Sequence, residues 1–178
     1  MKDSKKFTSK KKILETANYI KEHALAWSVS YADEKQIDKI NILAATQQSM
    51  HHSIQNILHS EYGKQYTDYS KLSLLIDGNY FKPFVLFEDG NLKPISHTCI
   101  KGGDHKFTSI AAASILAKVA RDEYIKDFCE KYPKLQEYYE IGNNKGYGTK
   151  KHMEGIQIYG ISKWHRKTFG ICQTSKII

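Results

Sequence analysis

The chain has 178 residues, 40% of them apolar, and its 27 lysines and arginines exceed its 19 acidic residues, giving a formal net charge of +8. This length and composition fit one globular domain over residues 1–178 and exclude a disordered, collagen-like or low-complexity chain. No apolar run approaches the roughly 18 residues of a membrane span, and the polar start is unlike a secretory signal. We therefore expect a soluble, cytoplasmic, monomeric protein without a membrane partner, and we interpret its three widely spaced cysteines as reduced thiols.

Basic residues gather near both ends of the chain. Six lysines lie within the first 12 residues, and Lys163, Arg166 and Lys167 lie near the last. A polyanion such as nucleic acid is the natural partner of two basic ends. Lysine runs that only keep a surface soluble explain the same charge, so the charge by itself leaves both interpretations open.

The first part of the chain shows helical and strand periods in turn. Behind a polar N-cap residue, apolar residues at helical spacing predict an amphipathic helix over residues 10–24. Large apolar residues then alternate with small or polar ones, which predicts a strand over 25–31. Helical spacings over 33–58 predict a short helix followed by a long one that starts after Asn41.

Three short apolar runs in the middle of the chain are typical of strands. The first ends on Asp77 and is followed by glycine, which predicts a buried strand with a polar end. The other two, over 84–87 and 94–100, flank an Asp-Gly turn and predict a pair of strands joined by that turn.

Two further helices follow the strands. An alanine-rich segment predicts a helix from Thr108 or Ser109 to Pro133, and after a loop the spacing predicts a final helix between an N-cap at Thr149 and a stop at Gly160. Strands that alternate with helices in this way indicate an α/β domain, with a mixed sheet flanked by helices.

Two aspartates are candidates for metal chemistry. Asp77 ends a buried strand, a place where α/β proteins commonly carry sites, although Asp-Gly-Asn after a strand is also a frequent turn. Asp122 lies inside the long predicted helix, where aspartate is a poor helix former, although an ordinary ion pair with Lys118 explains it as well. Carboxylates bind hard divalent ions such as magnesium, but two of them are too few to surround an ion.

Glycine-rich loops offer a further candidate. Tyr147 lies between two glycines in the segment KGYGT, and an exposed aromatic ring held in this way can stack on a sugar or base. The two glycines of KGGD, residues 101–104, fit a bend after a strand better than a phosphate-binding turn. The eight histidines show no metal-binding spacing, so the pattern assigns none of them a role.

Several of these segments together resemble ribonuclease HII, the type 2 ribonuclease H family. The segments that carry the resemblance are DSKKFT (3–8), LLIDGN (74–79), KFTSIAAASILAKVARD (106–122), NKGYGTKKH (144–152) and HRKTF (165–169). The resemblance implies a ribonuclease H-like fold and an endonuclease that uses manganese or magnesium. It also implies cleavage of the RNA strand of RNA/DNA hybrids and at ribonucleotides embedded in duplex DNA, leaving a 5′-phosphate and a 3′-hydroxyl.

The same resemblance implies roles for individual residues. Asp77 and Asp122 match metal-binding aspartates and would be catalytic, and Tyr147 matches the tyrosine that stacks on the deoxyribose after the ribonucleotide. Lys5 lies where the family approaches a substrate phosphate. Lys101 and His165 match family segments but receive no role.

One family motif has no counterpart in this sequence. The family begins with a strand bearing a DExGRG-type motif, which supplies two more metal carboxylates and contacts to the ribonucleotide 2′-hydroxyl. We therefore expect a fold without the first strands of the family, and we hypothesise poor stability and little or no hydrolysis by this chain alone. A non-catalytic nucleic-acid-binding module and an inert fragment stay open as alternatives.

Overall fold

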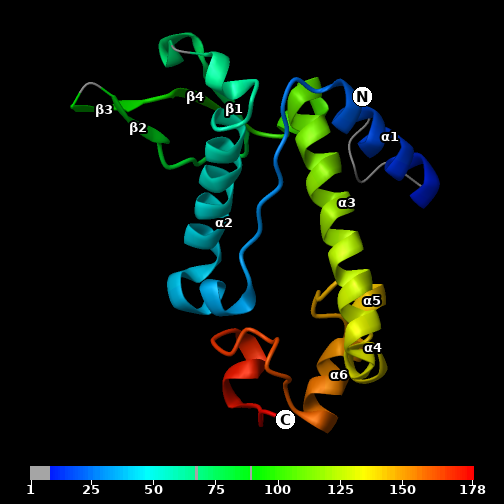
Figure 1. Cartoon of the computed structure of the whole chain (residues 1–178). Coiled ribbons are helices and arrows are strands. Elements are labelled where there is room, and N and C mark those ends of the chain that lie inside the picture. Colours follow the sequence, from blue (N-terminus) through cyan, green and yellow to red (C-terminus); the bar gives the residue numbers. More distant parts are fainter. Residues whose placement is uncertain (1–8, 67, 89) are drawn as a thin grey trace. The chain divides into compact units, whose positions relative to one another are not determined.

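The computed structural model describes residues 9–66, 68–88 and 90–178 (Figure 1). Its helices are α1 (Lys10–His23), α2 (Glu34–Leu58), α3 (Thr108–Lys131), α4 (Pro133–Tyr139), α5 (Ile141–Asn144) and α6 (Lys150–Tyr159). Its strands are β1 (Ser73–Asp77), β2 (Val85–Glu88), β3 (Asn91–Pro94) and β4 (Ser96–Ile100). The chain divides into two compact units: the first unit comprises Met1–Ser30 and Gln47–Val119, and the second unit comprises Tyr31–Thr46 and Ala120–Ile178.

Helix α1 confirms the first predicted helix. The hydroxyl of Ser9 accepts a hydrogen bond from the backbone N–H of Lys12 at 3.5 Å, which satisfies one of the donors left open at a helix start. The apolar face of α1 is buried against the first half of α3, in a cluster formed by Ile13, Ala17, Ile20, Ile115, Leu116 and Val119.

The strand predicted over residues 25–31 is wrong. This segment is extended but forms no strand pairing with any described residue, and its large side chains lie in solvent, with Leu25 70% and Tyr31 73% exposed. A period of two indicates an extended chain, whereas a strand also needs a neighbour for its backbone groups, and that neighbour is not encoded in the period. Within the first unit, the segment contacts α2 through a hydrogen bond from the Asn56 side chain to the Ser28 hydroxyl at 3.1 Å.

Helix α2 is broken where the sequence predicts. Asn41 has a left-handed φ of 66° with ψ 166°, so the helical course stops there. Its side-chain oxygen accepts the backbone N–H of Ala44 at 3.0 Å and thereby caps the second, longer part of α2.

The strands form two small sheets within the first unit. Strands β1 and β4 are parallel, and Asp77 lies opposite Ile100 at their carboxyl ends, whereas β2 and β3 form an antiparallel hairpin (Figure 1). The prediction that 94–100 is one strand beside 84–87 is therefore wrong. Ile95 lies between β3 and β4, with its side chain buried in the core and its N–H donating to the Phe84 carbonyl at 2.9 Å.

The core of the first unit explains why these sheets are stable. The second half of α2 covers the strands with apolar side chains, and the buried members of this cluster are Leu58, Ile76, Phe81, Phe84 and Ile95. The architecture is mixed α/β with helices flanking small sheets, which confirms the predicted fold class.

The second unit is helical and contains two short helices, α4 and α5, that the sequence did not predict. Its core is formed by Ile125, Leu135, Tyr139, Ile141, Ile156 and Ile161. Helix α6 confirms the last predicted helix, with the Thr149 hydroxyl accepting the His152 N–H and with Gly160 ending the helix at a φ of 86°. Gly155 lets α6 approach α4 closely, because a side chain at this position would overlap the carbonyl oxygen of Tyr138.

Two further findings concern the cysteines and the lengths of the helices. All three cysteines, Cys99, Cys129 and Cys172, are free thiols. Over the residues that the structure describes, no helix combines the length and the apolar character needed to cross a membrane.

Candidate nucleic-acid and metal site

Asp77 lies at the carboxyl end of β1, as predicted. The predicted burial of this strand is wrong, because Ile76 is its only buried residue and the side chain of Asp77 is exposed at the edge. The parallel pairing continues one step further, because the N–H of Gly78 donates to the carbonyl of Ile100 at 3.0 Å. Gly78 has a φ of 113°, a conformation that side chains rarely adopt, so the chain turns away sharply after the aspartate.

The turn after β4 brings a second aspartate to the same edge. The N–H of Gly103 donates to Oδ1 of Asp77 at 2.8 Å. A Cβ at Gly103 would lie 2.5 Å from the end of the Ile110 side chain, which would have to shift, and 3.4 Å from Asp77 Oδ1. Asp104 follows directly and keeps only 12% of its side chain exposed.

Sequence analysis missed Asp104 because it interpreted KGGD as a simple bend. The sequence does contain a signal for Asp104, since Asp77 ends one apolar run and Asp104 closely follows another. It becomes informative only when the two runs are known to be parallel neighbours, because parallel strands end at one edge of a sheet. The sequence had instead suggested that the run before KGGD pairs with residues 84–87.

The two carboxylates fit a divalent ion only in part. Magnesium and manganese prefer oxygen ligands, and magnesium is often held by one or two carboxylates together with substrate phosphates and water. Within residues 9–66, 68–88 and 90–178, no group of three or more histidine, cysteine, aspartate or glutamate side chains could hold a metal. An ion at Asp77 would therefore need further ligands from elsewhere, and Oδ1 of the neighbouring Asp104 lies 3.9 Å from Nε2 of His105.

Asp122 lies in the second half of α3 and is partly buried. It belongs to the second unit, whereas Asp77 belongs to the first. The approach of these two aspartates to a common ion therefore stays a prediction.

Tyr147 is presented to solvent by a tight turn in the second unit. Lys145 and Gly146 have left-handed φ values of 55° and 82°, and the Tyr147 side chain is 71% exposed. Asn144 closes the turn, since its carbonyl accepts the Tyr147 N–H and its side-chain oxygen accepts the Gly146 N–H, each at 2.9 Å. The exposed ring agrees with the prediction from the glycine-flanked tyrosine.

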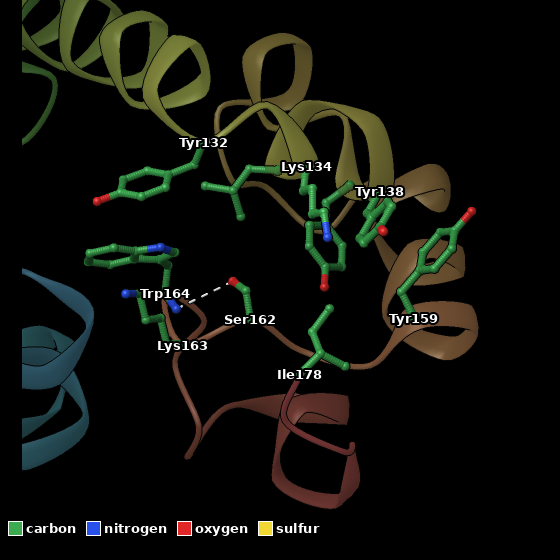
Figure 2. A pocket seen from close by; sticks show the side chains of 10 residues that line it. Tyr132, Lys134, Tyr138, Tyr159, Ser162, Lys163, Trp164 and Ile178 are labelled. Carbon is green, nitrogen blue, oxygen red and sulfur yellow. Dashed lines mark hydrogen bonds between the residues drawn. The ribbon is translucent and has the colours of Figure 1, made fainter.

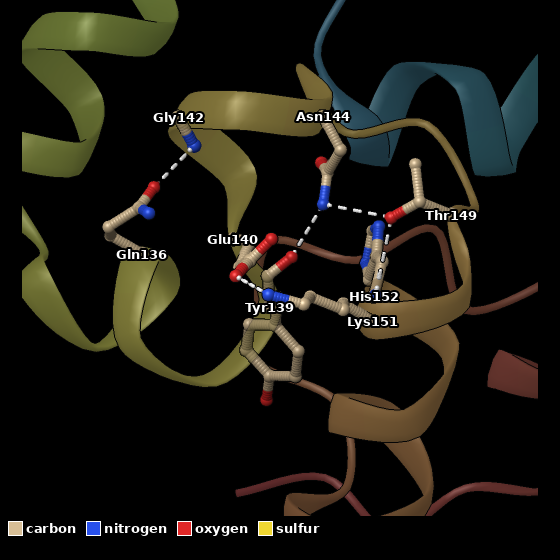
Figure 3. A network of polar contacts seen from close by, with 8 residues as sticks. All are labelled: Gln136, Tyr139, Glu140, Gly142, Asn144, Thr149, Lys151 and His152. Atoms are coloured by element: carbon tan, nitrogen blue, oxygen red, sulfur yellow. Dashed lines mark hydrogen bonds and ion pairs between the residues drawn. The ribbon is translucent and has the colours of Figure 1, made fainter.

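Further polar contacts anchor this turn to the helices (Figure 3). The amide of Asn144 donates to the carbonyl of Tyr139, at the end of α4, at 2.6 Å. Arg121 donates from Nη2 to the carbonyl of Lys145 at 2.7 Å, which ties the turn to α3 one residue before Asp122. The turn is therefore a fixed part of the second unit.

Two histidines that received no role lie beneath the turn. The carbonyl of Tyr147 accepts a hydrogen bond from Nδ1 of His152 at 2.9 Å, and Nε2 of His152 lies 3.1 Å from Nε2 of His165. Both histidines are buried, with His152 6% and His165 9% exposed. Burial, together with the neighbouring His152, lowers the pKa of His165 from 6.5 to about 4.

The basic segment near the end of the chain is held by one carboxylate. Asp38 accepts hydrogen bonds from the N–H of Lys167 at 2.7 Å and from the N–H and hydroxyl of Thr168 at 3.2 and 2.6 Å. Burial raises the pKa of Asp38, but these hydrogen bonds and the charge of Arg166 outweigh it and lower the pKa below its usual value. The backbone that carries Arg166 and Lys167 is thus locally ordered. Lys5, the other predicted phosphate contact, lies outside the described residues.

The second unit also contains a cavity of about 660 Å³ that none of the predicted site residues lines (Figure 2). Aromatic rings dominate its wall, including Tyr138 and Tyr159, which stack with their centroids 4.1 Å apart. Two lysines line it as well, and Lys163 lies 4.8 Å from the ring centroid of Trp164.

These features define a class of protein. An exposed carboxylate at a strand end, with a second aspartate in the neighbouring turn, suits phosphodiester chemistry, and an exposed tyrosine in a fixed turn suits contact with a nucleotide. A basic segment adds attraction for phosphates. Together they are the features of a nuclease.

Comparison with known proteins identifies the family. The model of the family described as Ribonuclease HII matches residues 1–172. A ribonuclease HII of Parabacteroides distasonis is 40% identical over 170 residues, covering 95% of this chain and 73% of the relative. That of Acholeplasma laidlawii is 42% identical over 169 residues, covering 94% and 70%, and that of Bacteroides thetaiotaomicron is 37% identical over 171 residues, covering 96% and 74%. The chain therefore belongs to the ribonuclease HII family and is by this resemblance a ribonuclease H-type nuclease.

Proposed function

We propose that this chain acts as a divalent-metal-dependent endonuclease that cuts the RNA strand of RNA/DNA hybrids and cuts at ribonucleotides embedded in duplex DNA. The products would carry a 5′-phosphate and a 3′-hydroxyl. The observation that carries the proposal is the acidic edge, where the Gly103 N–H orients Asp77 beside the turn that bears Asp104. This edge occurs in a chain of the ribonuclease HII family.

The carboxylates would hold the ion. Asp77 and Asp104 are the proposed ligands from the first unit, and Asp122 is the proposed ligand from the second. A bound magnesium or manganese ion would supply an activated water and would neutralise charge on the phosphate. The N–H of Gly103 has a separate task, because its hydrogen bond to Oδ1 fixes the orientation of the Asp77 carboxylate before any ion binds.

Binding of the duplex would rest on stacking and on charge. The exposed Tyr147 ring would stack on the deoxyribose next to the ribonucleotide, a kind of contact comparable to base stacking, which is worth about 1–3 kcal/mol. Lys5, Arg166 and Lys167 would lie near phosphates, so the affinity should fall as the salt concentration rises. The ordered backbone around Lys167 supports this role for the basic segment.

The decisive test uses a DNA duplex with one embedded ribonucleotide and the purified chain, with magnesium or manganese. We expect one cut at the ribonucleotide, and no cut in the same duplex made only of DNA. Asp77→Asn should reduce cutting by more than about 100-fold and leave duplex binding intact, because asparagine keeps an oxygen for the Gly103 N–H but loses the charge.

Two further variants sharpen this test. Asp104→Asn should behave like Asp77→Asn, whereas Asp127→Asn, an exposed position of α3, serves as the matched control and should cut normally. Full activity of Asp77→Asn would remove Asp77 from the site.

A second candidate function is binding without catalysis. It is favoured by the finding that the described residues contain no group of three or more side chains suited to hold a metal. Salt-sensitive binding of the duplex without any cut, in either metal, would support this second function and contradict the first.

A further inference from the structure

A chain of hydrogen bonds in the second unit ends on the backbone carbonyl of Tyr147. It begins at Ser162, whose N–H and hydroxyl lie 3.1 and 2.9 Å from Nδ1 of His165. It continues from Nε2 of His165 to Nε2 of His152 over 3.1 Å. It ends where Nδ1 of His152 lies 2.9 Å from the Tyr147 carbonyl oxygen.

The partners determine where each proton lies. A carbonyl only accepts, so Nδ1 of His152 must carry a proton and, in a neutral ring, Nε2 of His152 must accept. Nε2 of His165 therefore donates to His152, which leaves Nδ1 of His165 as the acceptor for the N–H of Ser162. Every donor and acceptor of the two rings is satisfied only in this one arrangement of two neutral imidazoles.

An added proton on either ring would break the chain. A proton on Nε2 of His152 would face the donor of His165, and a proton on Nδ1 of His165 would face the Ser162 N–H. The surroundings also disfavour a charge on His165, since this residue is buried and the Tyr139 ring lies edge-on to it with centroids 4.6 Å apart. Among the described residues, the titratable side chains that contact His165 are His152 on α6 and Tyr139 on α4.

We propose that His152 and His165 are positioning residues, which hold the Tyr147 carbonyl and so aim the exposed ring of Tyr147 at the nucleic-acid backbone. The inference rests on the proposed role of Tyr147 in substrate binding. It extends that role because it assigns a function to two buried residues that contact no substrate themselves. The same carbonyl also accepts the Thr149 N–H at 2.8 Å, so the bond from His152 is a second hydrogen bond that fixes the turn.

Ser162 beside His165 invites one other interpretation, namely a nucleophile with its base. Nδ1 of His165 already accepts the backbone N–H of Ser162, so its lone pair is occupied. A general base also works best with a pKa near the operating pH, and the pKa of about 4 for His165 is far below the neutral range. Ser162 and His165 therefore have a structural role, in which Ser162 begins the chain of hydrogen bonds.

Asparagine and glutamine provide matched variants of His152, because their amide groups reach the positions of Nδ1 and Nε2 respectively. His152→Asn keeps a donor for the Tyr147 carbonyl, whereas His152→Gln removes it. We expect His152→Gln to weaken binding of the ribonucleotide-containing duplex about fivefold, the value of one net hydrogen bond, and His152→Asn to stay within about twofold of the unchanged chain. Equal weakening in both variants would mean that the ring only fills space, and the proposal would be wrong.

Tyr147→Ala separates this inference from the proposed function. If Tyr147→Ala leaves the dissociation constant of the duplex unchanged, the proposed role of Tyr147 fails. If Tyr147→Ala weakens binding but His152→Gln does not, only the histidine inference fails. If both are right, His152→Gln should have no further effect in a chain that already carries Tyr147→Ala.

Nitrogen NMR of the imidazole rings tests the chain without any substrate. At neutral pH we expect His152 as the tautomer protonated on Nδ1 and His165 as the tautomer protonated on Nε2. The reverse tautomers, or a His165 ring that is doubly protonated at about pH 6.5, would overturn the proposal.

Discussion

Acid should destabilise the second unit through His165. The pKa of this side chain is about 4 in the folded protein against 6.5 for an exposed histidine, so the unfolded chain takes up the proton first as the pH falls. The stability that comes from a neutral His165 is therefore complete above about pH 6.5 and is lost progressively down to about pH 4. The total loss is about 3 kcal/mol, of which about 2 kcal/mol should be lost at about pH 5.

Urea unfolding at about pH 7.5 and about pH 5 measures this loss. The comparison variant is His165→Asn, which keeps an acceptor near Ser162 but cannot take up a proton. We expect the variant to be less stable at about pH 7.5 but to lose about 2 kcal/mol less than the unchanged chain when the solution is acidified. The other histidines are common to both proteins, and Asp38, with its lowered pKa, loses its contribution only below about pH 3.8. Equal losses in the two proteins would refute the assignment of a buried neutral His165.

Three further predictions concern stability, each measured by urea unfolding. Gly155→Ala should cost about 2 kcal/mol or more, because the added Cβ overlaps the Tyr138 carbonyl. The control Gly148→Ala meets only ordinary contacts and should change stability little. A tolerated Gly155→Ala would contradict the close approach of α6 to α4. Asp38→Ala should cost about 1–3 kcal/mol above pH 4 and less at a pH where the carboxylate is protonated, because a neutral carboxyl group accepts hydrogen bonds more weakly. A pH-independent cost would count against the hydrogen-bonded carboxylate. Ile115→Ala should cost about 2–5 kcal/mol, since Ile115 is fully buried between α1 and α3, and a cost below about 1 kcal/mol would argue against that packing.

The helices were predictable from the sequence because their signals are local. The period of α1 and its Ser9 cap, the break of α2 at Asn41 and the limits of α6 each depend on residues a few positions apart. The exposure of the Tyr147 ring was likewise predictable from the two glycines that flank it. Family motifs added the nuclease class, which the comparisons bear out.

Strand neighbours were not predictable, and the errors in the site follow from that. Residues 25–31 have a strand period without a strand partner, and residues 94–100 divide between a hairpin and a parallel pair. Asp104 escaped notice because its relation to Asp77 exists only once β4 lies parallel to β1.

The amino-acid sequence alone therefore determined the helices, the position of Asp77 at a strand end and the family, since periodicity, caps and short motifs are properties of neighbouring residues. Tertiary structure decided which strands pair, which aspartate accompanies Asp77 and what supports Tyr147. His152 and His165 show the reason, because they are 13 positions apart and only the packing of the folded unit makes them a neutral hydrogen-bonded pair.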